Sequence, residues 1–262
     1  MIYVKHNAIH QIPYLEVVAS DRDNEKLPFV LFLHGFTSAK EHNLHYAYYL
    51  AERGFRVILP DAKLHGERAE NLTEAELEFS FWYIVISTIH ELSYFVDHYS
   101  EKGLIYNDQI GVVGTSMGGI VTLGALTQYR WIKCAVSLMG SPAYVAFAKS
   151  KIDALKQSGK SIPLSKEEEQ RFYEQLEKYD LSLCPKVLNE RPLLFWHSKV
   201  DDVVPFEPTY NFYLKARSYY KDQPDNLKFI EDETSGHKVS RKGVLETVKW
   251  FDIYLKKNIA HQ

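Results

Sequence analysis

The stretch from Ile110 to Ile120 constrains the fold of this chain more than any other, and it reads Ile-Gly-Val-Val-Gly-Thr-Ser-Met-Gly-Gly-Ile. A short β-branched run stops at Gly114, and glycines stand two residues before and two residues after Ser116. The G-x-S-x-G pattern is typical of a sharp strand-to-helix turn that holds a serine in a strained conformation. Positions 114 and 118 can carry almost no side chain there, because their neighbours must approach closely. The pattern therefore predicts Ser116 as a nucleophile at the N-terminus of a helix, where negative charge is favoured.

Other glycine-rich turns also connect a strand to a helix. A phosphate-binding loop carries Lys followed by Ser or Thr after its glycines, and a dinucleotide fingerprint reads G-x-G-x-x-G. Residues 110–120 contain neither pattern. The remaining alternative is a plain glycine-rich turn without chemistry.

The rest of the chain alternates strand and helix patterns around this turn. An opening antiparallel hairpin is expected over 2–5 and 12–19. Five later strands are expected besides the one before Ser116, and they cover 28–33, 56–59, 132–139, 192–196 and 227–230. The helices expected between and after them cover 41–53, 73–102 (as one helix or two), 207–220 and 239–257. This alternation predicts an α/β fold with a mostly parallel, doubly wound sheet and helices on both faces.

Residues 143–190 interrupt the alternation. They are charged and helical, with a capping box at Ser165 and Glu168 and apolar residues at helical spacing (Phe172, Leu176, Tyr179). Core strands resume afterwards, which favours one domain over 1–262 with an inserted helical cap rather than a second domain.

Composition and charge limit which partners and which compartment suit this chain. A net charge of −3 is too small to favour nucleic acid as a partner, and the longest apolar run, at 79–86, is far short of the ~20 residues that span a bilayer. The start of the sequence shows no secretory signal pattern. The two cysteines, Cys134 and Cys184, have no metal-type spacing and suit a reducing compartment. We expect a cytoplasmic protein.

A nucleophilic serine needs a base, and the base needs an acid that orients it. The expected strand 192–196 is followed by His197, Asp201 and Asp202, and the expected strand 227–230 is followed by Gly236-His237. Both loops leave the carboxyl ends of strands, where open α/β sheets place their sites. Along the chain the order is therefore serine, acid, base, which is the order in one known hydrolase arrangement.

On these residues the chain resembles the α/β-hydrolase superfamily over nearly its whole length. The blocks His34-Gly-Phe36, Gly114–Gly119, His197 to Pro205 and Gly236-His237 resemble the prolyl-oligopeptidase and dienelactone-hydrolase branch. That branch normally has a glycine after the histidine of the third block, where this chain has Ser198, and the change is expected to loosen the turn slightly. The insertion is not specific to any member.

The resemblance implies an eight-stranded type of sheet and a role for each site residue. The acid stands four residues before the proline, which selects Asp201 over Asp202. Ser116, Asp201 and His237 would form the catalytic triad, and the backbone amides of Phe36 and Met117 the oxyanion hole. His34 would be structural.

Four histidines (His34, His42, His45 and His65) invite a metal interpretation. No acidic ligand stands at a metalloprotease spacing and no His-Glu-x-x-His occurs, so neither a metal nor another cofactor is expected. The stretch Asp61–Arg68 resembles a loop at the rim of the site in relatives, and a turn held by the Asp61 carboxylate is preferred over a substrate contact.

Together these features predict a serine hydrolase, and most specifically a carboxylesterase that cleaves small-molecule esters through an acyl-enzyme. The alternatives are a peptidase of the prolyl-oligopeptidase type, an acyltransferase, and a non-catalytic binding protein of the same fold. Such peptidases carry a propeller or an acidic pair, and a propeller is not expected at this length. The insertion is expected to cover the site, with Tyr144 and Phe147 lining the pocket. The alternative for the insertion is a peripheral helical pair or a homodimer contact.

Overall fold

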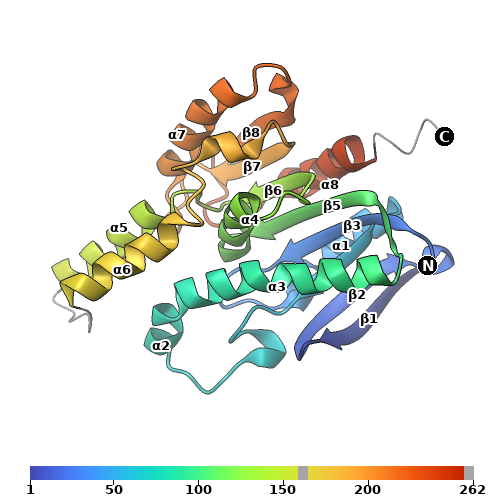
Figure 1. Ribbon diagram of the computed structural model, residues 1–262, viewed down its shortest axis with the longest axis horizontal. Coiled ribbons are helices and arrows are strands. Elements are labelled where there is room, and N and C mark those ends of the chain that lie inside the picture. Colours follow the sequence, from blue (N-terminus) through green and yellow to red (C-terminus); the bar gives the residue numbers. More distant parts are fainter. Residues whose placement is uncertain (159–164, 257–262) are drawn as a thin grey trace.

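The computed structural model describes residues 1–158 and 165–256, and it is built on one eight-stranded sheet (Figure 1). The strands follow the order β1-β2-β4-β3-β5-β6-β7-β8. β1 and β2 are antiparallel, β2 pairs with β4 antiparallel, and the strands from β4 to β8 are parallel. The bounds are Ile2–Ile9, Ile12–Ala19, Leu27–Leu33, Arg56–Pro60, Ile105–Thr115, Cys134–Leu138, Leu193–Ser198 and Leu227–Asp232 for β1 to β8. The predicted mostly parallel eight-stranded sheet is confirmed.

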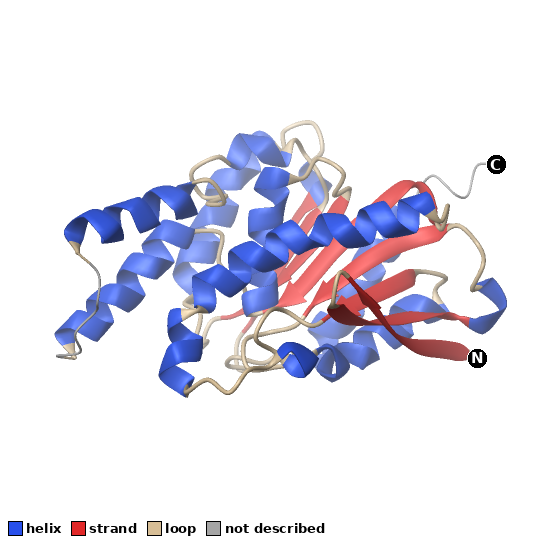
Figure 2. Cartoon of the chain, turned by 60° about the horizontal axis from the view of Figure 1, so that its bottom comes forward, coloured by secondary structure: helices blue, strands red, loops and turns tan. Residues whose placement is uncertain are grey.

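Helices cover both faces of the sheet (Figure 2). The bounds of α1 to α8 are Leu44–Glu52, Glu74–Phe79, Phe81–Glu101, Met117–Gln128, Tyr144–Gln157, Lys166–Glu177, Phe206–Ala216 and Arg241–Leu255. One core lies between the sheet and α1 and α8, and the other lies under α3, α4 and α7. Adjacent residues of β5 serve opposite cores, since Val112 belongs to the α3 side and Val113 to the α1 side. This explains why the central strands are continuous apolar runs.

The segment 73–102 forms two helices, α2 and α3, which meet at Ser80. Thr73 and Glu76 make the expected capping box, in which each side chain accepts a hydrogen bond from the other's backbone N–H. In the part of the chain that is described, no helix combines the length and the apolar character needed to cross a membrane.

The insertion forms a helical hairpin of α5 and α6, which projects from the body of the molecule (Figures 1 and 2). Its residues 159–164, like the chain end 257–262, lie outside the described residues. Asp180 closes the base of the hairpin: its Oδ2 accepts from the Val145 N–H at 2.9 Å, and its Oδ1 accepts from the Ser182 N–H at 2.9 Å. This buried carboxylate therefore ties the start of α5 to the chain that returns after α6.

Candidate active site

Ser116 lies at the tip of the turn between β5 and α4, with φ +54° and ψ −116°. Its N–H donates to the Leu138 carbonyl at 2.8 Å, which anchors the turn to the neighbouring strand. A Cβ added at Gly114 would come within 2.2 Å of the Gly118 carbonyl carbon, and one at Gly118 within 2.1 Å of the Leu33 oxygen. Only glycine fits at these two positions, because a side chain there would push the helix away from the strands.

Three side chains from separate loops meet above this turn. His237 Nε2 lies 2.8 Å from Ser116 Oγ, and His237 Nδ1 lies 2.9 and 2.8 Å from the two carboxylate oxygens of Asp201. Ser116 follows β5, Asp201 follows β7 and His237 follows β8, so all three stand at the carboxyl edge of the parallel strands. The Asp201 side chain is completely buried, whereas that of His237 is 21% exposed.

The hydrogen bonds indicate which nitrogen of His237 carries the proton. An ionised carboxylate only accepts, so His237 Nδ1 carries a proton and Nε2 is free to accept from the Ser116 hydroxyl. Burial raises the pKa of Asp201, but hydrogen bonds from His197 and His237 and from the amides of Val204 and Val203 lower it by more, and the net pKa lies well below its usual value. The carboxylate is therefore ionised at neutral pH.

The neighbouring carboxylate, Asp202, is exposed and takes no part in these contacts. Ser198 behaves differently from the expectation that it loosens the turn. It is fully buried at the end of β7, and its Oγ accepts from the Gly236 N–H at 3.1 Å. The hydroxyl thus tethers the loop that carries His237, a link that the sequence alone did not reveal because it joins two distant loops.

Two backbone amides are available as oxyanion donors. Met117 is the first residue of α4, so its N–H has no acceptor within the helix. The Phe36 N–H donates to no other group in the described parts of the chain. Gly35 lies against the turn, since a Cβ there would be 3.4 Å from Ser116 Cβ. In the described residues, the N–H groups of Phe36 and Met117 therefore have no hydrogen-bond acceptor, and both residues lie in segments beside Ser116.

The two predicted pocket residues differ in their burial. Tyr144 is fully buried, and its hydroxyl donates to the Ile120 carbonyl at 2.6 Å in the space that Gly124 leaves. It packs α5 on α4, so the prediction that it lines a pocket is wrong. Phe147 is half-buried, and its ring centroid lies 6.4 Å from that of Phe81, which in turn lies 5.5 Å from that of Phe36.

The Asp61 loop is a turn held by its carboxylate. Asp61 is fully buried and accepts from the Lys40 N–H at 3.0 Å, from Lys40 Nζ at 2.7 Å and from the Glu67 N–H at 3.0 Å. Gly66 has φ +54°, and a Cβ there would lie 2.2 Å from an Asp61 oxygen. Within the described ranges, no group of three or more His, Cys, Asp or Glu side chains could hold a metal ion.

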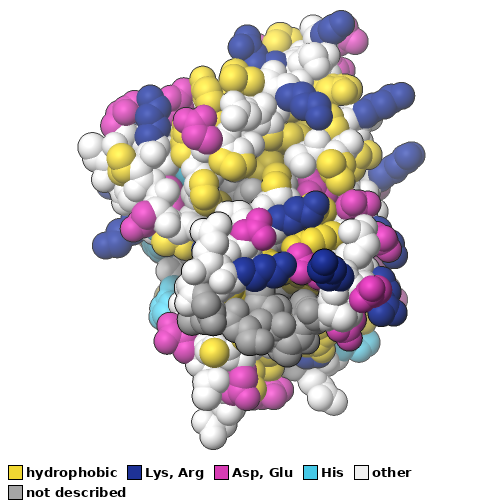
Figure 3. Space-filling view, turned by 90° about the vertical axis from the view of Figure 1, so that its left-hand side faces the viewer, with side chains coloured by type: hydrophobic (Ala, Val, Ile, Leu, Met, Phe, Trp, Pro, Cys, Tyr) yellow, Lys and Arg dark blue, Asp and Glu magenta, His cyan; other side chains and the backbone are white. Residues whose placement is uncertain are grey.

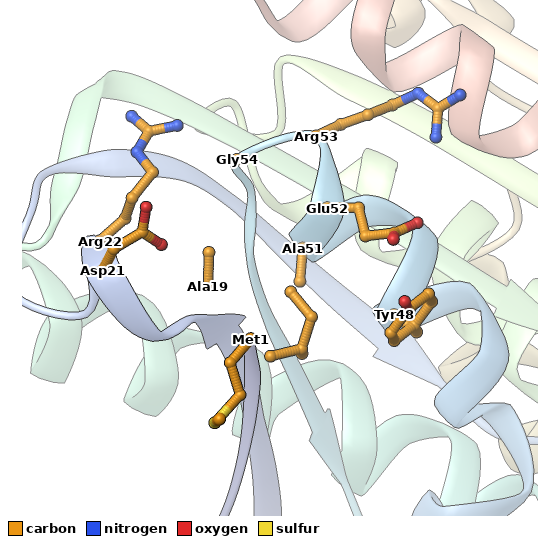
Figure 4. Close-up of a pocket in the computed structure, with 10 residues that line it drawn as sticks. Met1, Ala19, Asp21, Arg22, Tyr48, Ala51, Glu52, Arg53 and Gly54 are labelled. Atoms are coloured by element: carbon orange, nitrogen blue, oxygen red, sulfur yellow. The ribbon is translucent and has the colours of Figure 1, made fainter.

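A separate hollow of about 490 Å³ lies at the opposite edge of the sheet (Figure 4). It is bounded by the amino-terminal side of β4, the end of α1 and the end of β2, and Arg22, Tyr48 and Arg53 are among its lining residues. The parallel strands start there, whereas Ser116 follows the carboxyl end of β5. This hollow does not contribute to the candidate site.

Comparisons with known proteins agree with this architecture. The model of the prolyl oligopeptidase family matches residues 41–260. The chain is 49% identical over 255 residues to "Putative esterase YitV" of Bacillus subtilis strain 168, an alignment that covers 97% of this chain and all of that protein. It is 31% identical over 208 residues to the esterase YjfP of Escherichia coli K12, covering 78% of this chain and 81% of that one. The crystal structure of TT1662 from Thermus thermophilus superposes with a TM-score of 0.77 at 17% identity, covering 98% of this chain and 100% of the other.

Proposed function

Because the chain belongs to the prolyl oligopeptidase family and is a serine hydrolase with the α/β-hydrolase fold, we propose that it is a carboxylesterase acting on small acyl esters, with Ser116, His237 and Asp201 as its catalytic triad. The observation that carries the assignment is the continuous hydrogen-bonded series from Ser116 Oγ through His237 to Asp201. A binding protein would have no need of a serine paired with a histidine that a buried carboxylate orients.

In the first half-reaction, Ser116 Oγ attacks the ester carbonyl carbon while its proton passes to His237 Nε2. The resulting imidazolium is stabilised by the buried, ionised Asp201. The amides of Phe36 and Met117 donate to the oxyanion of the tetrahedral intermediate. As the intermediate collapses, the C–O bond to the alcohol breaks and the leaving oxygen takes the proton from His237 Nε2.

In the second half-reaction, water replaces the alcohol. His237 Nε2 accepts a proton from the water, whose oxygen attacks the acyl-enzyme carbonyl carbon. The second tetrahedral intermediate expels Ser116 Oγ, which regains its proton from His237. The products are the carboxylic acid and the free enzyme, and the chemistry needs only residues of this chain.

The aromatic series Phe36–Phe81–Phe147 supports an apolar acyl group as substrate. It leads from the oxyanion loop to α5, and all three rings are half-buried. We propose that the hairpin acts as a cap along one side of the site and that Phe147 contacts the acyl chain. The end of the molecule at which the hairpin lies carries acidic, basic and hydrophobic side chains side by side (Figure 3).

A peptidase is the second candidate, because the matching family is named for one. A panel of p-nitrophenyl esters and aminoacyl-nitroanilides separates the two. We expect kcat/KM for acetate and butyrate esters to exceed that for every nitroanilide. Faster hydrolysis of a nitroanilide would replace the esterase assignment by a peptidase.

The chemistry itself is tested with a fluorophosphonate probe, which labels activated serines. We expect stoichiometric labelling of the wild-type protein and none of Ser116→Ala, with ester turnover reduced to the ~10³–10⁴-fold enhancement over water that other triad enzymes retain without their triad. Near-normal turnover by a folded Ser116→Ala protein would contradict the mechanism.

We also propose a cytoplasmic location, because Cys134 and Cys184 are both free thiols. A homodimer contact made by the hairpin stays a prediction. Light scattering of the purified protein measures whether the protein is a dimer.

A further inference from the structure

Two histidines link the loop that follows β3 to the loop that follows β4, because each accepts a hydrogen bond from the backbone of the other's loop. We call His34 and His65 the crossed histidines. His34 belongs to the first loop, and its Nε2 accepts from the Ala62 N–H of the second loop at 3.0 Å. His65 belongs to the second loop, and its Nε2 accepts from the Thr37 N–H of the first loop at 3.0 Å. The two rings contact each other, with centroids 5.4 Å apart. Neither histidine touches Ser116 in these contacts, so the triad does not explain their arrangement.

The backbone partners determine the protonation of both rings. A backbone N–H only donates, so each Nε2 must be unprotonated. The Nδ1 atoms face carbonyl oxygens, Gly35 O for His34 at 2.8 Å and Lys63 O for His65 at 2.9 Å, so each Nδ1 carries the proton. Both rings are therefore neutral and in the same tautomer. Burial lowers the pKa of both histidines, which favours this state.

These contacts hold the peptide groups on both sides of Phe36. The Gly35 carbonyl accepts from His34 Nδ1 and, at 3.2 Å, from the Ser38 N–H. In a trans peptide the Phe36 N–H points away from the Gly35 oxygen, so fixing that oxygen fixes the direction of the amide. His65 holds the next peptide through the Thr37 N–H. Thr37 has φ +58°, a conformation that costs a non-glycine residue free energy and needs such support.

The position of His65 beside the donor residue adds to this constraint. Its ring packs edge-on against Phe36 with centroids 5.3 Å apart, and Phe81 packs on Phe36 at 5.5 Å. His65 itself is only 3% exposed. It thus contacts the residue whose amide stabilises the oxyanion, the next amide along the chain and the ring of His34.

We propose that His65, acting with His34, is a positioning residue that presets the Phe36 amide toward the oxyanion of the reacting ester. The proposal deepens the proposed esterase function and rests on it. An amide that rotated away would leave the oxyanion with one donor instead of two. The effect belongs to the transition state, because the ground-state carbonyl gains less from these donors than the oxyanion does.

A pair of polar variants separates the two contacts of His65. In His65→Gln the side-chain oxygen can reach the place of Nε2 and accept from Thr37. In His65→Asn the shorter side chain can reach only the place of Nδ1 and keeps only the Lys63 contact. His65→Leu keeps neither and serves as the second loss variant if His65→Asn does not fold. Arg68→Met is the matched control: it removes the Arg68–Glu91 ion pair and the contact with Asp61 O from the same loop without touching residues 34–40.

Steady-state kinetics on a p-nitrophenyl ester and the affinity of a trifluoromethyl ketone, whose hemiketal oxyanion occupies the hole, provide the readouts. We expect His65→Asn and His65→Leu to lower kcat by roughly 10- to 100-fold with KM nearly unchanged, less than the 10²–10³-fold cost of losing an oxyanion donor outright. Ketone affinity should fall in parallel, and His65→Gln should recover most of both losses. Arg68→Met should lower the melting temperature with little effect on kcat.

The proposal is overturned if His65→Gln and His65→Asn lose kcat equally, or if the His65 variants change KM instead of kcat. It is also overturned if Arg68→Met, at the same loss of melting temperature as the His65 variants, loses as much kcat as they do. The wild-type protein distinguishes this failure from that of the proposed function. A wild type without ester turnover refutes the esterase itself, whereas an active wild type with unaffected His65 variants refutes only the positioning role.

Discussion

At the scale of single residues, the site depends on which atoms can only donate and which can only accept. Asp201 Oδ1 accepts from the amides of Val203 and Val204, both at 2.9 Å. These two fixed donors orient the carboxylate, so that both of its oxygens face His237 Nδ1, with Oδ2 the nearer at 2.8 Å. His197 Nε2 donates to the Val204 carbonyl at 2.9 Å and lies 3.3 Å from Oδ2. The acid is therefore held by the loop that carries it.

This arrangement predicts a specific effect of Asp201→Asn. The two amides would keep the Asn oxygen in place of Oδ1, so the Asn NH₂ group would take the place of Oδ2, the oxygen nearer to His237 Nδ1, and could only donate toward that nitrogen. His237 would then carry its proton on Nε2 and could not accept from Ser116. We expect kcat to fall by about 10⁴, as when the tautomer is inverted in another triad enzyme. Ester kinetics of the purified variant measure this.

Asp202→Asn is the control, because that carboxylate is exposed and one residue away. Its kcat should stay close to that of the wild type. A loss at Asp202 that equals or exceeds the loss at Asp201 would mean that the wrong carboxylate had been assigned to the triad.

At the scale of elements, Asp180 ties together the two ends of the hairpin of α5 and α6. Its carboxylate is buried and accepts from Val145 N–H, Ser182 N–H and the Ser182 hydroxyl. Asp180→Ala would leave these buried donors without an acceptor. We expect a loss of roughly 1–3 kcal/mol in the free energy of unfolding, measured by urea denaturation. Asp153→Ala, which removes an exposed carboxylate from α5, should change it far less, and equal losses would show that Asp180 does not hold the hairpin.

The same hairpin carries Phe147, the last ring of the Phe36–Phe81–Phe147 series. Phe147→Ala removes apolar surface next to Phe81, and we expect the ratio of kcat/KM for hexanoate over acetate esters to fall by about 10-fold. Phe172→Ala is the matched control, because Phe172 is also half-buried but lies on α6 with Tyr173 as its aromatic contact. An unchanged ratio in a folded Phe147→Ala protein would remove the hairpin from acyl-chain selection.

The elements also show how far the sequence predicts this protein. The sheet and the neighbourhood of Ser116 follow from local signals, because parallel strands bring the loops at their carboxyl ends to one edge. Tyr144 was misplaced since its surroundings depend on Gly124, twenty residues earlier in the chain, where an added Cβ would lie 2.1 Å from the Tyr144 hydroxyl. The Ser198 tether and the crossed histidines were missed for the same reason. Each is a contact between two loops, and no local pattern shows which loops will be neighbours.

At the scale of the whole molecule, the buried histidine His34 couples the stability of the fold to pH. Burial lowers the pKa of His34 from 6.5 to about 4, although the hydrogen bond to the Gly35 carbonyl opposes the shift. Above pH 6.5 the ring is neutral in both the folded and the unfolded chain, and it adds no pH dependence. As the pH falls from 6.5 to about 4, the unfolded chain binds a proton that the folded chain does not, so stability is lost across this window.

We therefore predict that His34 alone lowers the free energy of unfolding by about 2 kcal/mol between pH 7 and pH 5, from a shift worth about 1.4 kcal/mol per pKa unit. His65 acts in the same direction, because burial lowers its pKa too. Urea unfolding of the wild type and of His34→Gln at the two pH values measures the effect, since glutamine can accept from the Ala62 N–H without titrating. The wild type should lose about 2 kcal/mol more than the variant. Between pH 7 and pH 8 the two proteins should change equally, which controls for the loss of packing in the variant. Parallel losses down to pH 5 would show that His34 gains its proton as readily in the folded chain as in the unfolded one, and that the crossed histidines are not held neutral.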